Sequence, residues 1–128
     1  MSQYKRIATK IADKELLTAA LEALNLTFEQ GDAVELNGYY AHGRTAQIVV
    51  RKAASDRYAE DLGFVWDAKS GAYQAVLTDW GDEATETLNE IKQQYAVQGV
   101  YQKATREGYT VTQEQQEDGT VRLQLRRY

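Results

Sequence analysis

The sequence of 128 residues contains no cysteine and no proline, and each absence excludes whole classes of chemistry and structure. Without cysteine there is no disulfide, no thiolate nucleophile, no iron–sulfur cluster and no cysteine-based zinc site. Without proline there are no proline-rich linkers or docking tails, which fits a chain built mostly of regular elements. Any catalysis or metal binding must therefore depend on other residue types.

Long apolar runs and an excess of positive charge are also missing. No apolar run approaches the roughly 20 residues that a membrane helix requires. The formal net charge of −4 argues against a protein whose main task is to neutralise a phosphate backbone. The segment 1–14 has no apolar core of the secretory type. We therefore expect one intracellular domain over residues 1–128, without a membrane span, and keep nucleic-acid binding as a minor alternative.

Local patterns predict the secondary structure. Asp13 is suited to cap a helix, Gly31-Asp32 and Asp67–Gly71 are suited to turns, and Asp118-Gly119 is a strong hairpin signal. The segment Asn37–Thr45 is predicted to be a loop. The secondary structure of Lys52–Glu60 is ambiguous. The predicted elements are a strand over Tyr4–Ile11, a helix over Lys14–Leu24, strands over Leu26–Gln30, Ala33–Leu36 and Ala46–Arg51, a hairpin of Phe64–Trp66 and Ala72–Leu77, a helix from Asp82 to Gly108, and a hairpin of Tyr109–Gln115 and Thr120–Arg126.

This order of elements favours an α+β fold. Strands between two helices predict an elaborated ferredoxin-like sandwich, an antiparallel sheet with both helices on one face. The other face would then meet solvent or a partner. Val121, Leu123 and Leu125 are expected to face the core, and Gly99 leaves open whether the long helix is continuous.

An enzyme would have to use the single histidine. His42 lies in a glycine-flanked loop and would need a carboxylate such as Asp67 or Asp79 in the same cleft to act in acid–base catalysis. A lone loop histidine without a second histidine or a helix-spaced carboxylate is more often solvated or structurally hydrogen-bonded. We therefore predict no catalytic residue and keep the His42 enzyme as an alternative.

The remaining polar clusters have structural explanations. Asp79, Asp82 and Glu83 fit the positive end of the second helix, and they lack the ligand spacing of a calcium-binding loop. The glycines match neither the P-loop nor the dinucleotide pattern. Three residues form a basic stripe on the C-terminal strand: Arg122, Arg126 and Arg127. The stripe fits the protection of an edge strand against aggregation by charge. The alternative is contact with RNA or with an acidic protein surface. We expect no metal and no cofactor.

Aromatic residues are more numerous than short strands can bury. Tyrosine and tryptophan are enriched at protein interfaces, so we predict a non-enzymatic protein-interaction or assembly module with a protein partner. Trp66 and Tyr73 have a second interpretation, because they can pair across the hairpin and cover the sheet. Binding of a small ligand or RNA on the open sheet face is an alternative function. The predicted partner-binding residues are Tyr39, Tyr40, His42, Arg44, Trp66, Tyr73 and Trp80.

The order and spacing of several short motifs resemble a known family. The motifs are Met1-Ser2-Gln3-Tyr4 with Ile7, Thr9, Ile11 and Asp13, then Leu16–Leu24, Asp61-Leu62-Gly63-Phe64 with Trp66, Gly71 and Tyr73, Gln94-Tyr95-Ala96, Gly108-Tyr109-Thr110-Val111, Glu117-Asp118-Gly119, and Leu125 with Arg127-Tyr128. Over nearly its whole length the chain resembles the hypothetical chloroplast reading frame thirty-five family of cyanobacteria and algal plastids. It departs from that family at Gln3-Tyr4, where His-Phe is common, and near Trp80. The resemblance implies a location in the cyanobacterial cytosol or plastid stroma and implies no activity.

Overall fold

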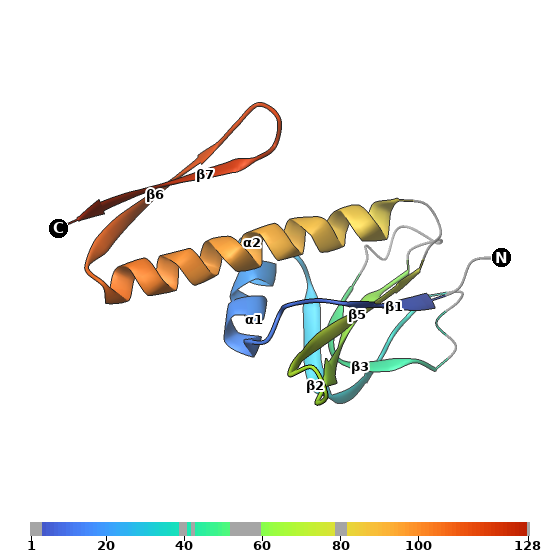
Figure 1. Cartoon of the computed structure of the whole chain (residues 1–128). Coiled ribbons are helices and arrows are strands. Elements are labelled where there is room, and N and C mark those ends of the chain that lie inside the picture. Colours follow the sequence, from blue (N-terminus) through green and yellow to red (C-terminus); the bar gives the residue numbers. More distant parts are fainter. Residues whose placement is uncertain (1–3, 39–40, 42, 52–59, 79–81, 128) are drawn as a thin grey trace.

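The computed structural model describes residues 4–38, 41, 43–51, 60–78 and 82–127. These residues form two helices and seven strands (Figure 1). In chain order the elements are β1 (Tyr4–Ala8), α1 (Lys14–Ala23), β2 (Phe28–Glu35), β3 (Thr45–Val50), β4 (Leu62–Asp67), β5 (Ala72–Thr78), α2 (Glu83–Arg106), β6 (Tyr109–Gln115) and β7 (Val121–Arg127).

Five of the strands form one sheet in the order β1-β5-β4-β3-β2, and every pairing in it is antiparallel. The predicted α+β class is therefore confirmed. The finer ferredoxin-like description is not confirmed, because β1 lies at the edge of this sheet and α2 leads into the separate β6–β7 hairpin instead of another strand of the sheet. The strand β1 consequently has one edge free of described strands.

Both helices pack on one face of this sheet. Asp13 caps α1 as predicted, and its side chain accepts a hydrogen bond from the backbone N–H of Leu16. The main core lies between the helices and the sheet, and each fully buried large side chain contributes about 1.5–3 kcal/mol to folding. Its buried members are Ile11, Leu17, Leu21, Ile48, Val50, Leu62, Phe64, Tyr73, Ala75, Leu77, Ala84, Leu88 and Ile91.

The opposite face of the sheet is less open than the sequence suggested. A second apolar cluster covers part of it, and its buried members are Tyr4, Leu36, Ala41, Ala46, Val49 and Val76. Gly63 lies within this packing, since an added Cβ would be 3.0 Å from the Ala46 Cβ. The expectation that this whole face meets solvent or a partner was therefore wrong for the part that the second cluster covers.

One local prediction needs correction, and the open question of the long helix is answered. Gly31-Asp32 is not a hairpin turn: β2 runs through it as one strand, with an irregular register between Gln30 and Val34 that marks a bulge. Gly99 does not break α2, which is continuous from Glu83 to Arg106. At that position α2 passes close to α1, because a Cβ on Gly99 would lie 3.9 Å from Leu16 Cδ1.

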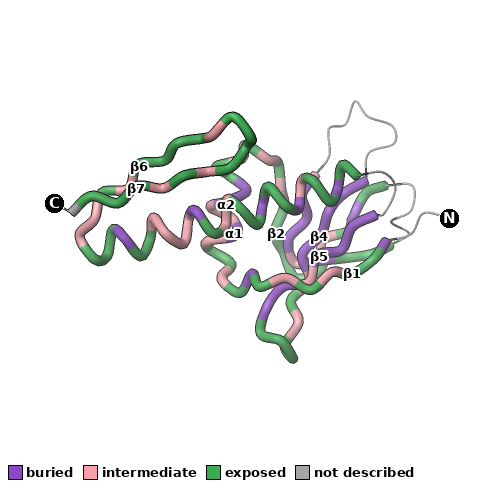
Figure 2. Tube along the Cα trace, turned by 45° about the horizontal axis from the view of Figure 1, so that its top comes forward, coloured by how far each residue is buried: buried purple, intermediate pink, exposed green. Residues whose placement is uncertain are grey.

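The prediction that the C-terminal hairpin faces the core is wrong. The strands β6 and β7 pair only with each other among the described strands, and they lie beside α2, away from the five-stranded sheet (Figures 1 and 2). Val121 and Leu123 are half-buried, and Leu125 is 50% exposed, so these residues do not enter the main core. In the described part of the chain, no helix is both long enough and apolar enough to cross a membrane.

Candidate functional site at the connection between β1 and α1

The connection between β1 and α1 is tied to β5 by hydrogen bonds. The Thr9 hydroxyl donates to the backbone oxygen of Tyr73 at 2.5 Å and accepts from the backbone N–H of Ile11 at 3.2 Å. The backbone N–H of Tyr73 donates to the Ile11 oxygen at 2.8 Å. The chain therefore continues alongside β5 after β1 ends at Ala8.

Tyr95 of α2 holds the same connection from the other side. Its phenolic oxygen accepts hydrogen bonds from the backbone N–H groups of Ala12, at 3.2 Å, and Asp13, at 3.1 Å. These N–H groups precede the first turn of α1, where no intrahelical acceptor is available to them. One side chain thus joins the start of α1 to the middle of α2.

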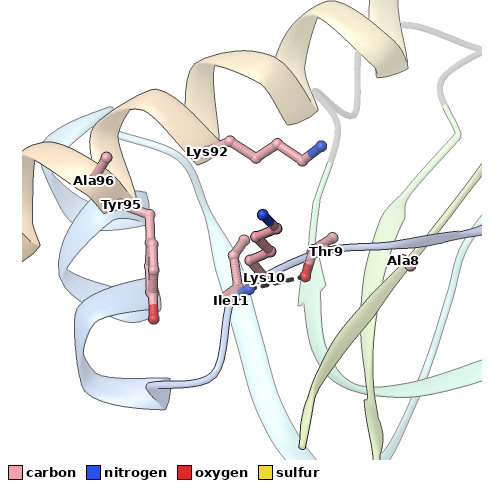
Figure 3. Close-up of a pocket in the computed structure, with 7 residues that line it drawn as sticks. All are labelled: Ala8, Thr9, Lys10, Ile11, Lys92, Tyr95 and Ala96. Carbon is pink, nitrogen blue, oxygen red and sulfur yellow. Dashed lines mark hydrogen bonds between the residues drawn. The ribbon is translucent and has the colours of Figure 1, made fainter. Parts of the chain in front are cut away.

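A cleft of about 480 Å³ opens between this connection and α2 (Figure 3). It is lined by Ala8, Thr9, Lys10, Ile11, Lys92, Tyr95 and Ala96. Most of the lining is apolar. Its volume falls within the range of about 300–1,000 Å³ that is typical of small-molecule sites.

Two positive charges lie at this cleft. Figure 3 shows the side chains of Lys10 and Lys92 extending into the space between the connection and α2. Both residues are exposed, and within the described residues neither ammonium group forms an ion pair. The cleft therefore combines apolar walls with two unpaired cations.

Trp66 and Tyr73 form the aromatic pair that the sequence indicated. They lie opposite each other on β4 and β5, with ring centroids 5.1 Å apart and the ring planes at 75°. Tyr73 is 6% exposed and belongs to the main core, whereas Trp66 is 42% exposed. Burial, with the nearby charges of Asp13 and Glu15, raises the pKa of Tyr73. Tyr73 thus offers little surface to a partner, and Trp66 offers a large one.

Trp66 is also fixed through its backbone. Its N–H donates to Oε1 of Gln47 at 3.1 Å, which links β4 to β3 beyond the last regular pairing of these strands. The following turn is ordered by Asp67, whose carboxylate accepts from the Ser70 hydroxyl at 2.9 Å. The exposed indole of Trp66 therefore packs on the buried ring of Tyr73, and its backbone is held by a hydrogen bond.

Arg44 lies on the other face of the sheet. Its guanidinium carbon is 5.6 Å from the centre of the Tyr4 ring, a cation–π contact, and Tyr4 belongs to the second cluster. The structure therefore does not bring Arg44 together with Trp66, which lies on the same side as Tyr73. The other predicted partner-binding residues, Tyr39, Tyr40, His42 and Trp80, lie outside the described residues, as does Asp79.

The buried carboxylates near Tyr4 are engaged with neighbouring groups. The Tyr4 hydroxyl donates to Glu60 Oε2 at 3.0 Å and to the backbone oxygen of Asp61 at 2.9 Å. Burial and the bond to Glu60 raise the pKa of Tyr4 well above its ordinary value of 10.0. In this part of the protein the acidic groups hold segments together. Across the described residues, no three His, Cys, Asp or Glu side chains form a group that could hold a metal ion.

Sequence reasoning missed Lys10, Lys92 and Tyr95 as site residues. Lys10 falls in a predicted strand and Lys92 in a predicted helix, and no local pattern connects them. Tyr95 is singled out only within the motif Gln94-Tyr95-Ala96. Only the packing of α2 against the connection places these residues at one cleft.

Comparisons with known proteins agree with the resemblance found in the sequence. No solved structure matches the chain. A relative named uncharacterized protein ycf35, from Cyanophora paradoxa, is 30% identical over 131 residues, which span 100% of this chain and 98% of the relative. A family model described as protein of unknown function, DUF1257, matches residues 20–124. The chain therefore belongs to the DUF1257 family.

Proposed function

We propose that the protein is a non-enzymatic interaction module that docks a protein partner through Trp66. The observation that carries this proposal is the indole itself, 42% exposed and packed edge-to-face on the buried ring of Tyr73. Tryptophan is among the residues that most often dominate binding energy at interfaces. Because the indole is already held by the sheet, little side-chain entropy is lost when a partner covers it.

The surroundings of Trp66 support docking rather than acid–base chemistry. The nearest acidic residue along the chain, Asp67, uses its carboxylate to accept hydrogen bonds from Ser70 and from the backbone of Lys69. These two bonds order the turn that follows Trp66, which gives the carboxylate a structural role. Trp66 therefore stands beside a structural carboxylate, in a setting suited to contact with an apolar partner surface.

The family suggests where this docking takes place. The chain belongs to DUF1257 and is similar to a protein of Cyanophora paradoxa. Together with the resemblance to cyanobacterial and algal-plastid proteins, this supports an accessory or assembly role in a photosynthetic cell. We place the module in the cyanobacterial cytosol or the plastid stroma.

Site-specific crosslinking tests the proposal. A photoreactive phenylalanine analogue replaces Ala68, an exposed residue of the turn that follows Trp66, so that the indole stays in place, and the control variant carries the analogue at Glu90, an exposed residue of α2. After illumination in a cyanobacterial lysate, we expect a discrete protein adduct from position 68 that position 90 does not give. The same adducts from both positions, or none from position 68, would overturn the proposal.

A further inference from the structure

We infer that the cleft between the β1–α1 connection and α2 binds a small organic acid, with its anionic head between Lys10 and Lys92 and its apolar body against the walls of the cleft. This site is separate from the docking proposed for Trp66, and it rests on different residues.

The walls of the cleft are formed before any ligand arrives. Thr9 uses its hydroxyl both to donate to Tyr73 and to accept from Ile11, and the Tyr95 oxygen accepts from two backbone N–H groups. These bonds fix both sides of the cleft to the two-helix core. A ligand would therefore pay little to organise the site.

The apolar part of the ligand has a matching surface. The apolar residues that line the cleft are Ala8, Ile11, Tyr95 and Ala96 (Figure 3). Burying a hydrocarbon against such a surface is favourable by roughly 25 cal/mol for each Å² removed from water. The cleft volume of about 480 Å³ accommodates a medium-length chain or a single ring.

The charge at the cleft selects the head group. Lys10 and Lys92 come from different elements and project into one space, although like charges in proximity repel each other (Figure 3). The strand β1 adds two further exposed cations, Lys5 and Arg6, so this edge is basic within a chain whose net charge is −4. The carboxylate of Asp13 caps α1 at Leu16, and within the described residues it forms no ion pair with either lysine.

An anion at the mouth of the cleft would satisfy both ammonium groups. Each lysine offers three N–H donors, and a carboxylate accepts from both sides. A neutral or cationic ligand would leave the two lysines unpaired, and a bare anion would leave the apolar walls exposed to water. The combination therefore specifies an amphipathic anion.

Titration of the full chain with octanoate, followed by amide NMR, tests this inference. We expect saturable shifts confined to residues 8–13 and 91–97, with octan-1-ol, octylamine and inorganic phosphate each binding at least tenfold more weakly. The double variant Lys10→Gln/Lys92→Gln should weaken octanoate binding at least tenfold, and Ala96→Leu should block the cleft. The control Lys69→Gln alters an exposed lysine in the β4–β5 turn and should bind as the wild type does.

The titrations are informative because the variants should remain folded, and specific results would contradict the proposed site. The altered side chains are exposed, so each variant should keep the wild-type amide spectrum apart from local changes. The inference is overturned if octanoate gives no shifts at the cleft, if octylamine or phosphate alone binds as tightly, or if the double variant binds octanoate as well as Lys69→Gln does.

Discussion

Arg51 and Asp61 form a short ion pair, with Nη1 of the arginine 2.6 Å from Oδ2 of the aspartate. The aspartate is almost fully buried, and the same Oδ2 accepts from the backbone N–H of Asn37. The arginine also donates to the Glu35 backbone oxygen and reaches the exposed Glu29. One buried carboxylate thus joins the end of β3, the start of β4 and the segment that follows β2.

Removal of this carboxylate should destabilise the fold strongly. We expect Asp61→Ala to lower the free energy of unfolding by about 3–5 kcal/mol, because it leaves Arg51 without its buried partner. Glu29→Ala is the matched control, since it removes the other partner of Arg51, whose side chain is 60% exposed, and should cost about 0–1 kcal/mol. Urea denaturation measures both. Equal losses in the two variants would show that the pair with Asp61 has no special role.

The hydroxyl group of Tyr95 should stabilise the connection between β1 and α1. We expect Tyr95→Phe to lower the free energy of unfolding by about 0.5–1.5 kcal/mol, because the N–H groups of Ala12 and Asp13 exchange the tyrosine oxygen for water. Tyr101→Phe is the control, since Tyr101 is also half-buried on α2 and has no hydrogen bond within the described residues. Amide exchange at residues 12 and 13 should accelerate only in Tyr95→Phe. Unchanged exchange there would refute the assigned role.

Stability should fall in alkaline solution because of Tyr4. Burial and the hydrogen bond to Glu60 raise its pKa in the folded protein, whereas the unfolded chain loses the phenolic proton near the ordinary value of 10.0. The stabilisation is therefore complete below about pH 10 and is lost as the pH rises further, with a slope of up to about 1.4 kcal/mol per pH unit. Burial raises the pKa of Tyr73 as well, and it adds to the loss in the same direction.

The variant Tyr4→Phe isolates this effect. It should be less stable at neutral pH, because Glu60 and the Asp61 carbonyl lose a donor, but its stability should fall less steeply between about pH 9 and pH 11. Denaturation curves across this range supply the measurement. A slope as steep as that of the wild type would mean that Tyr4 does not carry the alkaline transition.

The C-terminal hairpin should open more readily than the sheet. A two-stranded hairpin is marginally stable alone, and β6–β7 packs mainly against α2 among the described elements. We expect its amides to exchange with solvent at least a hundredfold faster than those of β4 and β5, which are paired on both sides and buried. Equal protection in hydrogen exchange would show that the hairpin belongs to the main cooperative unit.

The parts of the fold that were predicted correctly are those that depend on neighbouring residues. The cap at Asp13, the turn over Asp67–Gly71 and the end of α2 at Gly108 follow from backbone requirements that one or two side chains reveal. At Gly31-Asp32 the same kind of signal failed, because a bulge and a turn both accept glycine and aspartate.

The predictions that failed or were missed concern tertiary arrangement. The alternation of Val121, Leu123 and Leu125 shows that these residues share one face of a strand, but not which element that face meets. Lys10 and Lys92 share a cleft only because α2 crosses the β1–α1 connection. For Trp66 and Tyr73 the cross-strand pairing was foreseen, and only the structure separates the buried ring from the exposed one.

The affinity of Trp66→Ala for the crosslinked partner tests the central claim most directly. Because Trp66 is 42% exposed and lies outside the main core, the variant should remain folded, although it loses the aromatic pair, worth about 0.5–1.5 kcal/mol, and the buried part of the indole surface. Isothermal titration should then give a Kd at least tenfold above that of the wild type, as expected for an interface hot spot, while Lys69→Ala in the neighbouring turn stays within about twofold. A Trp66→Ala protein that is folded and binds the partner with wild-type affinity would contradict the account.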